Sequence, residues 1–300
     1  MNSPIMIACA HGTSNAQGAA EVNALRDAIA ALRPGLDVRE AYVDVQQPDL
    51  VDVMAGLPGD PDGGSAGASA VVVPLLLSVG YHVKVDIARA VKSRPGTVAA
   101  APLGPDPRLA ALLDQRLREA GVTDNDSIVL AAAGSSNPNA AVSVEELLGQ
   151  LQALRSNRIV AAYGASAKPS VPDAVAMLRE ELEGGAGAGE SAGAVDVGGR
   201  VVIASYLLAP GFFHDQLAKA GADLITEPLL PSPVLAEIAL ERYDAAIAKA
   251  REAAAAASAA QPAKPKVKGP AEAAADRTSD AQQEGFFKAV RRFVTKYFPR

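Results

Sequence analysis

The chain has only three histidines, and two of them stand in similar surroundings. His11 follows the apolar segment 5–10 and precedes a Gly-Thr-Ser-Asn turn, and His82 follows the apolar segment 70–77 and a Ser-Val-Gly turn. Both apolar segments are predicted to be strands, and the carboxyl ends of parallel strands meet at the edge where open α/β sheets bind ligands. We therefore expect both imidazoles in one crevice, where neutral imidazole can bind a divalent metal or take a proton.

Asp44 ends another apolar segment and is expected at the same sheet edge as His11 and His82. Two imidazoles and one carboxylate match a facial metal site that leaves coordination positions open. The residues alone leave a second interpretation open. In that interpretation the histidines are ordinary cap or loop residues and Asp44 is a cap or loop carboxylate.

The turns beside the two histidines are candidates for substrate contacts. Thr13, Ser14 and Asn15 in the first turn, and Ser78 and Gly80 in the second, precede predicted helices. The first backbone N–H groups of a helix suit anionic oxygens. The chain has no P-loop, G-x-G-x-x-G or nucleophile-elbow pattern, so the usual marks of nucleotide binding and of serine hydrolases are missing.

Short apolar segments alternate with amphipathic ones over the first 254 residues, which is typical of βα units around a parallel sheet. Strands are expected at 5–10, 37–43, 70–77, 97–101, 127–132, 158–163, 200–206 and 223–226. Helices are expected at 17–32, 49–57, 82–92, 106–120, 140–155, 171–182, 212–220 and 233–254. The predicted fold is therefore α/β, with a parallel four-stranded sheet flanked by helices in each half.

The two halves resemble each other, so we predict two similar domains in tandem, a first domain of residues 1–122 and a second of residues 123–254. Ala133, Ala165 and Phe213 stand where the first half has His11, Asp44 and His82. The second domain is therefore expected to lack the constellation and to supply one wall of the cleft. His214, one position beyond Phe213, is either a helix-start residue or a peripheral contact at that cleft.

Length and composition bound the class of protein. Three hundred residues suffice for two domains, and a content of 4% aromatic residues favours helices layered on sheets, with small aliphatic cores. The single Cys9 excludes an internal disulfide and is expected to pack inside a strand. The net charge of −6 argues against a nucleic-acid partner. No signal peptide or membrane span is recognised, so we expect a cytoplasmic protein.

Residues 255–300 differ from both domains. The segment 255–284 is rich in Ala, Pro and Lys and is predicted to be a disordered linker. The segment 285–300 is predicted to be a basic amphipathic helix, and residues 262–300 carry nine Lys and Arg against four Asp and Glu. The apolar stripe of that helix needs burial. The sequence leaves open whether it lies on an anionic membrane surface, on a partner protein or on the body of this protein.

These motifs resemble those of a known family. The segments Cys9-Ala10-His11-Gly12-Thr13, Tyr42-Val43-Asp44 with Pro48, and 74–83 are similar to the class II tetrapyrrole chelatases, above all to the sirohydrochlorin chelatases. The second half resembles their degenerate C-terminal domain through the segment 205–213. The likeness covers about residues 4–250.

The resemblance implies ATP-independent insertion of Fe²⁺ or Co²⁺ into sirohydrochlorin, for siroheme or cobalamin synthesis, in a cleft between two α/β domains. At the matching positions, His11 and His82 would be the catalytic, metal-handling histidines and Asp44 the accompanying carboxylate. The metal would be a substrate, and no tightly bound cofactor is expected. The alternative is a non-catalytic tetrapyrrole or metal carrier with the same fold.

The chain departs from the family at the residues after His11. Where the family often has a basic and then an acidic residue, this chain has Ser14 and Asn15. Lys84 is the candidate replacement for holding substrate carboxylates. The residues expected to bind substrate are Thr13, Ser14, Asn15, Ser78, Gly80 and Lys84.

Overall fold

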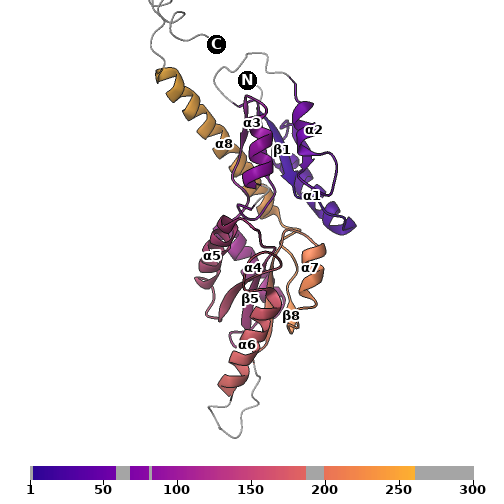
Figure 1. The fold of residues 1–300 in the computed structure, drawn as a ribbon, viewed down its shortest axis with the longest axis vertical. Coiled ribbons are helices and arrows are strands. Elements are labelled where there is room, and N and C mark those ends of the chain that lie inside the picture. The colour runs from indigo at the N-terminus through magenta and orange to yellow at the C-terminus, as the bar shows by residue number, and fades with distance from the viewer. Residues whose placement is uncertain (1–2, 59–67, 81–82, 187–198, 261–300) are drawn as a thin grey trace, which may run out of the picture. The chain divides into compact units, whose positions relative to one another are not determined.

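The computed structural model describes residues 3–58, 68–80, 83–186 and 199–260 (Figure 1). Contacts divide the chain into a unit of residues 1–255 and a second unit of residues 256–300. The first unit contains two four-stranded parallel sheets flanked by helices, as predicted. The tandem α/β architecture is therefore confirmed.

The first sheet has the strand order β2-β1-β3-β4 and the second the order β6-β5-β7-β8. The strands are β1 (Ile5–Ala10), β2 (Val38–Tyr42), β3 (Ala70–Pro74), β4 (Thr97–Ala99), β5 (Ser127–Ala132), β6 (Ile159–Tyr163), β7 (Val201–Tyr206) and β8 (Leu224–Ile225). The helices are α1 (Ala16–Leu32), α2 (Leu50–Ala55), α3 (Ala88–Lys92), α4 (Pro107–Glu119), α5 (Pro138–Gln152), α6 (Val171–Ala186), α7 (Phe212–Leu217) and α8 (Pro233–Ala260). A π-helical turn, η1 (Val83–Ile87), precedes α3, where the sequence predicts one regular helix.

Successive side chains of a strand point to opposite sides of the sheet, and the central strands β1, β3, β5 and β7 are buried on both faces. In β1, Met6 and Ala8 join a core that continues from the first sheet to the second. Ile7 and Cys9 instead pack into a separate core together with Leu50 of α2. A continuous apolar segment with no alternation follows from this two-sided burial.

The loops after β1 and β5 show the internal repeat at backbone resolution. Gly12 and Gly134 both have positive φ, +98° and +85°. A Cβ at Gly12 would lie 2.1 Å from the carbonyl oxygen of Asp44, and a Cβ at Gly134 would lie 2.0 Å from that of Ala165. Only glycine fits such a close approach of two loops. Asp44 and Ala165 are therefore structural counterparts, as the sequence comparison predicts.

Two helices pack across the boundary predicted between residues 122 and 123. Helix α4 contacts α5 and β7 of the second sheet. Helix α8 contacts the first domain, where the Tyr243 hydroxyl donates to the carbonyl oxygen of Pro4 and Asp244 pairs with both terminal nitrogens of Arg33. The strands of the two sheets lie on either side of residues 122 and 123, whereas α4 and α8 make contacts across that position, and the domain boundary stays a prediction.

The end of α8 corrects the predicted start of the linker. The helix continues through Ala260, six residues beyond the predicted end at 254. Alanine has the highest helix propensity of all residues, so an alanine-rich segment extends a helix even without tertiary contacts. The rest of the predicted linker and the predicted helix 285–300 lie outside the described residues. Within the described ranges, no helix has the length and hydropathy needed to span a membrane.

Candidate functional site

A cavity of about 670 Å³ lies where the carboxyl ends of strands from both sheets meet. Its first-domain wall follows β1, β2 and β3, and its second-domain wall follows β5, β6 and β7. The volume falls in the range of about 300–1,000 Å³ that is typical of small-molecule sites. The cavity therefore has the size of a site for a small molecule.

His11 follows β1 directly and lines the cavity, as predicted. Its side chain is half-buried, and Nδ1 lies 3.3 Å from the carbonyl oxygen of Gly12. Gly12 allows the chain to turn beneath the imidazole because its positive φ and the close approach of Asp44 exclude a side chain. The local sequence therefore positions His11 through a glycine that nothing else can replace.

Thr13 and Ser14 line the cavity, whereas Asn15 is not among the described residues that line it. The Asn15 side chain caps α1 by accepting from the N–H of Gly18 at 2.9 Å. Gln46, which sequence reasoning did not single out, also lines the cavity, and its Oε1 accepts from the N–H of Thr13 at 2.8 Å. The turn after His11 is therefore held by its own cap and by the loop after β2.

Asp44 lies in the loop after β2, but its side chain is exposed and is not among the described residues lining the cavity. Its Oδ1 accepts from the N–H of Val45 at 2.8 Å. Its backbone carbonyl oxygen accepts from the N–H of Gln46 at 2.6 Å and lies against Gly12. In this structure Asp44 shapes the loops around His11.

Ser78 and Gly80, in the loop after β3, line the cavity as predicted. The second domain holds this loop through Asn137, whose Nδ2 donates to the carbonyl oxygens of Val79 at 3.1 Å and of Gly80 at 3.4 Å. His82 and the side chain of Lys84 lie outside the described residues. The roles predicted for them remain predictions.

The second-domain wall has the composition that the degenerate repeat predicts. Ala133, Ala165 and Phe213, which replace the first domain's constellation, all line the cavity. His214 also lines it from the first turn of α7, and its Nε2 lies 3.4 Å from the carbonyl oxygen of Thr226. The cavity therefore presents imidazoles from both domains, His11 and His214.

Residues 5–120 match the CbiX family model. SirB from Bacillus subtilis with Fe³⁺ superposes with a TM-score of 0.64 at 19% identity, covering 83% of this chain and 98% of that one. The sirohydrochlorin chelatase SirB from Bacillus subtilis subspecies spizizenii in complex with cobalt gives 0.60 at 17% identity, with 82% and 96% covered. A multi-domain Deinococcus radiodurans protein with structural similarity to chelatases gives 0.50 at 17% identity, with 80% and 55% covered. No curated protein sequence matches the chain.

Residues 5–120 match the CbiX family, and the fold of the chain resembles that of the SirB chelatases. The CbiX match spans the whole first sheet and the segments that carry His11, Asp44 and His82. The structural matches to SirB cover more than four-fifths of the chain, so the chelatase-like fold extends over both domains.

The electrostatics of this chelatase-like cavity are unusual for a site expected to bind a polycarboxylate. Among the described residues that line it there is no Lys, Arg, Asp or Glu. The polar groups on its walls are neutral hydroxyls and amides together with His11 and His214. Within the same described ranges, no three His, Cys, Asp or Glu side chains gather as a metal site.

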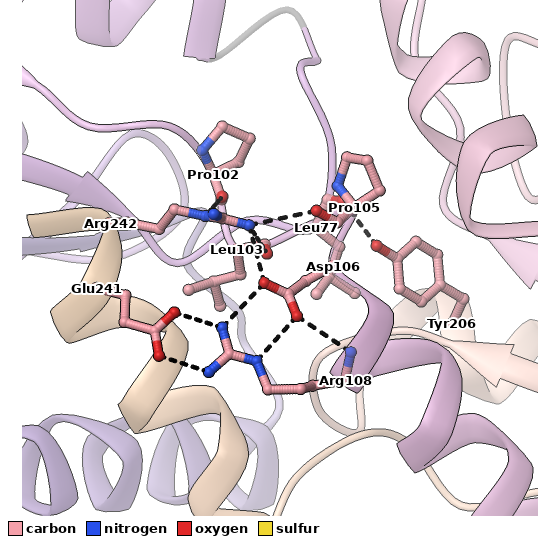
Figure 2. Close-up of polar contacts among 9 residues, drawn as sticks. All are labelled: Leu77, Pro102, Leu103, Pro105, Asp106, Arg108, Tyr206, Glu241 and Arg242. Carbon is pink, nitrogen blue, oxygen red and sulfur yellow. Dashed lines mark hydrogen bonds and ion pairs between the residues drawn. The ribbon is translucent and has the colours of Figure 1, made fainter. Parts of the chain in front are cut away.

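A polar network links α8 to the start of α4 (Figure 2). The guanidinium of Arg242 on α8 donates to Asp106 at 3.1 Å and to the carbonyl oxygen of Pro102 at 3.1 Å. Arg108 on α4 binds Asp106 and forms a bidentate pair with Glu241 on α8, at 2.6 and 2.7 Å. Burial raises the pKa of Asp106, but the hydrogen bonds and charges of Arg108 and Arg242 outweigh burial and hold the pKa below its ordinary value.

Sequence reasoning missed this network because its members lie far apart in the chain. Asp106 is recognisable as the cap of α4, since it precedes Pro107 and its carboxylate accepts from the N–H of Arg108. Nothing local indicates that Arg242, more than a hundred residues later, binds the same carboxylate.

Cys9 behaves as predicted: burial raises the pKa of its thiol to about 12, so it stays protonated near neutral pH.

Proposed function

We propose that this protein inserts a divalent metal, Fe²⁺ or Co²⁺, into sirohydrochlorin without ATP. The observation that carries the proposal is that His11 lines a 670 Å³ cavity within the part of the chain that matches CbiX. The similar SirB structures, described with Fe³⁺ and with cobalt, support a metal as the second substrate.

The reaction exchanges two protons for one metal ion. The two pyrrole N–H groups of the ring lose their protons, the metal sheds water, and the four ring nitrogens coordinate the ion. A site for this reaction needs a metal donor and a base close to one face of the macrocycle. An imidazole can serve as either, since its neutral form carries one lone pair and its pKa lies near neutral pH.

In the proposal, His11 helps to deliver the metal and accepts protons. In the tautomer whose Nδ1–H donates to the carbonyl oxygen of Gly12, Nε2 carries the lone pair that binds the metal or takes a proton. His82 is proposed as the second imidazole on the strength of its motif. Asp44, exposed and held by Val45, is proposed to add negative charge that attracts the cation and to tune its hold on the metal.

An anaerobic assay with sirohydrochlorin and each metal separately tests the proposal, because the absorbance spectrum of the ring changes when it is metallated. We expect His11→Ala to abolish insertion while the circular dichroism spectrum and thermal unfolding stay unchanged. Gln115→Ala is the matched control, because Gln115 is exposed on α4 and its amide donates to Glu119, away from the cavity. Full activity of His11→Ala would overturn the assignment, and ring binding without metallated product would identify a carrier instead.

A further inference from the structure

Two exposed apolar side chains line the cavity, one from each domain. Val45, in the loop after β2, is 59% exposed, and Phe212, the first residue of α7, is 69% exposed. The other large hydrophobic side chains exposed in the described ranges are not on the cavity wall: Leu32, Val51, Val142, Leu154 and Met177. Phe212 is the only aromatic residue in this exposed group.

Hydrogen bonds of its loop hold Val45 in an unusual backbone conformation. Its φ of +59° lies in the left-handed region, which β-branched residues rarely adopt. Three hydrogen bonds fix the loop: Val45 N–H to the Asp44 carboxylate, Gln46 N–H to the Asp44 carbonyl, and Thr13 N–H to the Gln46 amide oxygen. Ser166, the counterpart in the second domain, has the same conformation at +64°. The turn therefore belongs to the repeat, whereas the apolar side chain occurs only in the first domain.

Phe212 is held at the start of α7 by its neighbour. The rings of Phe212 and Phe213 meet edge to face, with centroids 5.5 Å apart and an angle of 76° between their planes. Phe213 is half-buried and packs against the core of the second sheet, so the ring that Phe212 contacts is itself held in place. An aromatic ring held in this way can stack on a flat conjugated ligand without much loss of side-chain freedom.

From the apolar pair and the uncharged walls we infer that Val45 and Phe212 bind the conjugated ring of the substrate. In this inference the described part of the cavity recognises the apolar macrocycle, and the carboxylates around its edge stay toward solvent. Both side chains stay largely exposed in the described part of the chain, and a ligand bound in the cavity would bury them. The inference rests on the proposed function, because it takes sirohydrochlorin as the ligand.

Binding of metal-free sirohydrochlorin, in the presence of a chelator, tests the inference separately from insertion. We expect Phe212→Ala to raise the Kd at least about tenfold, since burial of a large apolar side chain on binding is lost. Phe212→Tyr keeps the ring and should stay within about threefold of the wild type. Val45→Ser, which copies Ser166, should raise the Kd by about threefold to tenfold. The controls Val51→Ala and Val142→Ala change side chains of similar exposure away from the cavity and should leave the Kd unchanged.

The dependence on salt distinguishes ring recognition from ion pairing. Apolar contact predicts that the wild-type Kd changes by less than about threefold between about 0.05 and 0.5 M NaCl, where exposed ion pairs are strongly screened. An unchanged Kd for Phe212→Ala would overturn the inference. So would a Kd that rises steeply with salt together with a larger loss for Lys84→Ala than for Phe212→Ala. If the inference fails in either way but the wild type still metallates sirohydrochlorin, the proposed function stands. If the wild type does not bind sirohydrochlorin, the inference and the proposed function are both overturned.

Discussion

The hydroxyl of Tyr206 donates a hydrogen bond to the carbonyl oxygen of Leu77 at 2.8 Å (Figure 2). Tyr206 ends β7 of the second domain, and Leu77 lies in the loop after β3 of the first. Burial raises the pKa of the Tyr206 hydroxyl above its ordinary value, so it remains a donor near neutral pH. The second domain, which lacks a counterpart of His11, therefore holds the first domain's cavity loop in place.

We expect Tyr206→Phe to destabilise the protein by about 1–3 kcal/mol, because the partly buried carbonyl oxygen of Leu77 loses its donor. Insertion should also slow, since the loop that carries Ser78 and Gly80 is no longer held at that point. Thermal unfolding and kcat/KM for insertion measure the two effects. A variant with wild-type stability and rate would show that the hydrogen bond has no positioning role.

Asn137 caps α5 and also binds the loop after β3, and two substitutions can separate these roles. Its Oδ1 caps α5 by accepting from the N–H of Asn139, and its Nδ2 donates to Val79 and Gly80. Asn137→Asp keeps the cap acceptor but removes the donor, so we expect slower insertion and a lower melting temperature, because the partly buried carbonyl oxygens of Val79 and Gly80 lose their donor. Asn137→Ala removes both and should in addition lose about 1 kcal/mol of stability, the usual contribution of a cap. Equal melting temperatures of the two variants would contradict this division.

Gly12→Ala should destabilise the protein by more than about 2 kcal/mol, because the new Cβ meets the carbonyl oxygen of Asp44 at 2.1 Å. Gly35→Ala is the matched control. Gly35 has a similar φ of +85°, but nothing lies within 4 Å of the position of its Cβ. The control should lose only about 1 kcal/mol, which is the cost of the left-handed conformation alone. Thermal unfolding that shows equal losses would mean that the contact with Asp44 is readily relieved.

Asp106 predicts how stability depends on pH. Its pKa in the folded protein lies below that in the unfolded chain, which is about 3.9 for a free aspartate. Such a group stabilises the fold fully above the unfolded pKa, and the contribution disappears as the pH falls through the folded pKa. The melting temperature of Asp106→Asn should therefore lie below that of the wild type at pH 7, and the gap should shrink below about pH 4.

Asparagine can still cap α4, so this substitution tests the charge on Asp106 rather than the cap. The buried carboxylate bound by Arg108 and Arg242 should contribute about 1–3 kcal/mol at neutral pH. A gap that stays constant from pH 7 to pH 3 would show that ionisation of Asp106 does not contribute to stability.

The local features of this protein follow from its sequence. Two-sided burial makes the strands continuous apolar segments, so β1 and β5 begin and end where predicted. The turn directly after His11 requires a glycine, and Gly12 supplies it. The repeat in the sequence likewise predicted that Asp44 and Ala165 are counterparts.

Tertiary structure alone decided which helix covers which sheet, which side chains reach the cavity and which apolar residues stay exposed. The packing of α4 on α5 and β7, and the binding of Asp106 by Arg242 of α8, join segments that no local pattern connects. The Asp44 carboxylate accepts from the N–H of Val45, a contact that the position of Asp44 after its strand did not predict, because loop side chains follow the hydrogen bonds within reach. Short-range propensities determine where elements begin and end, whereas packing between distant segments determines what those elements present to a ligand.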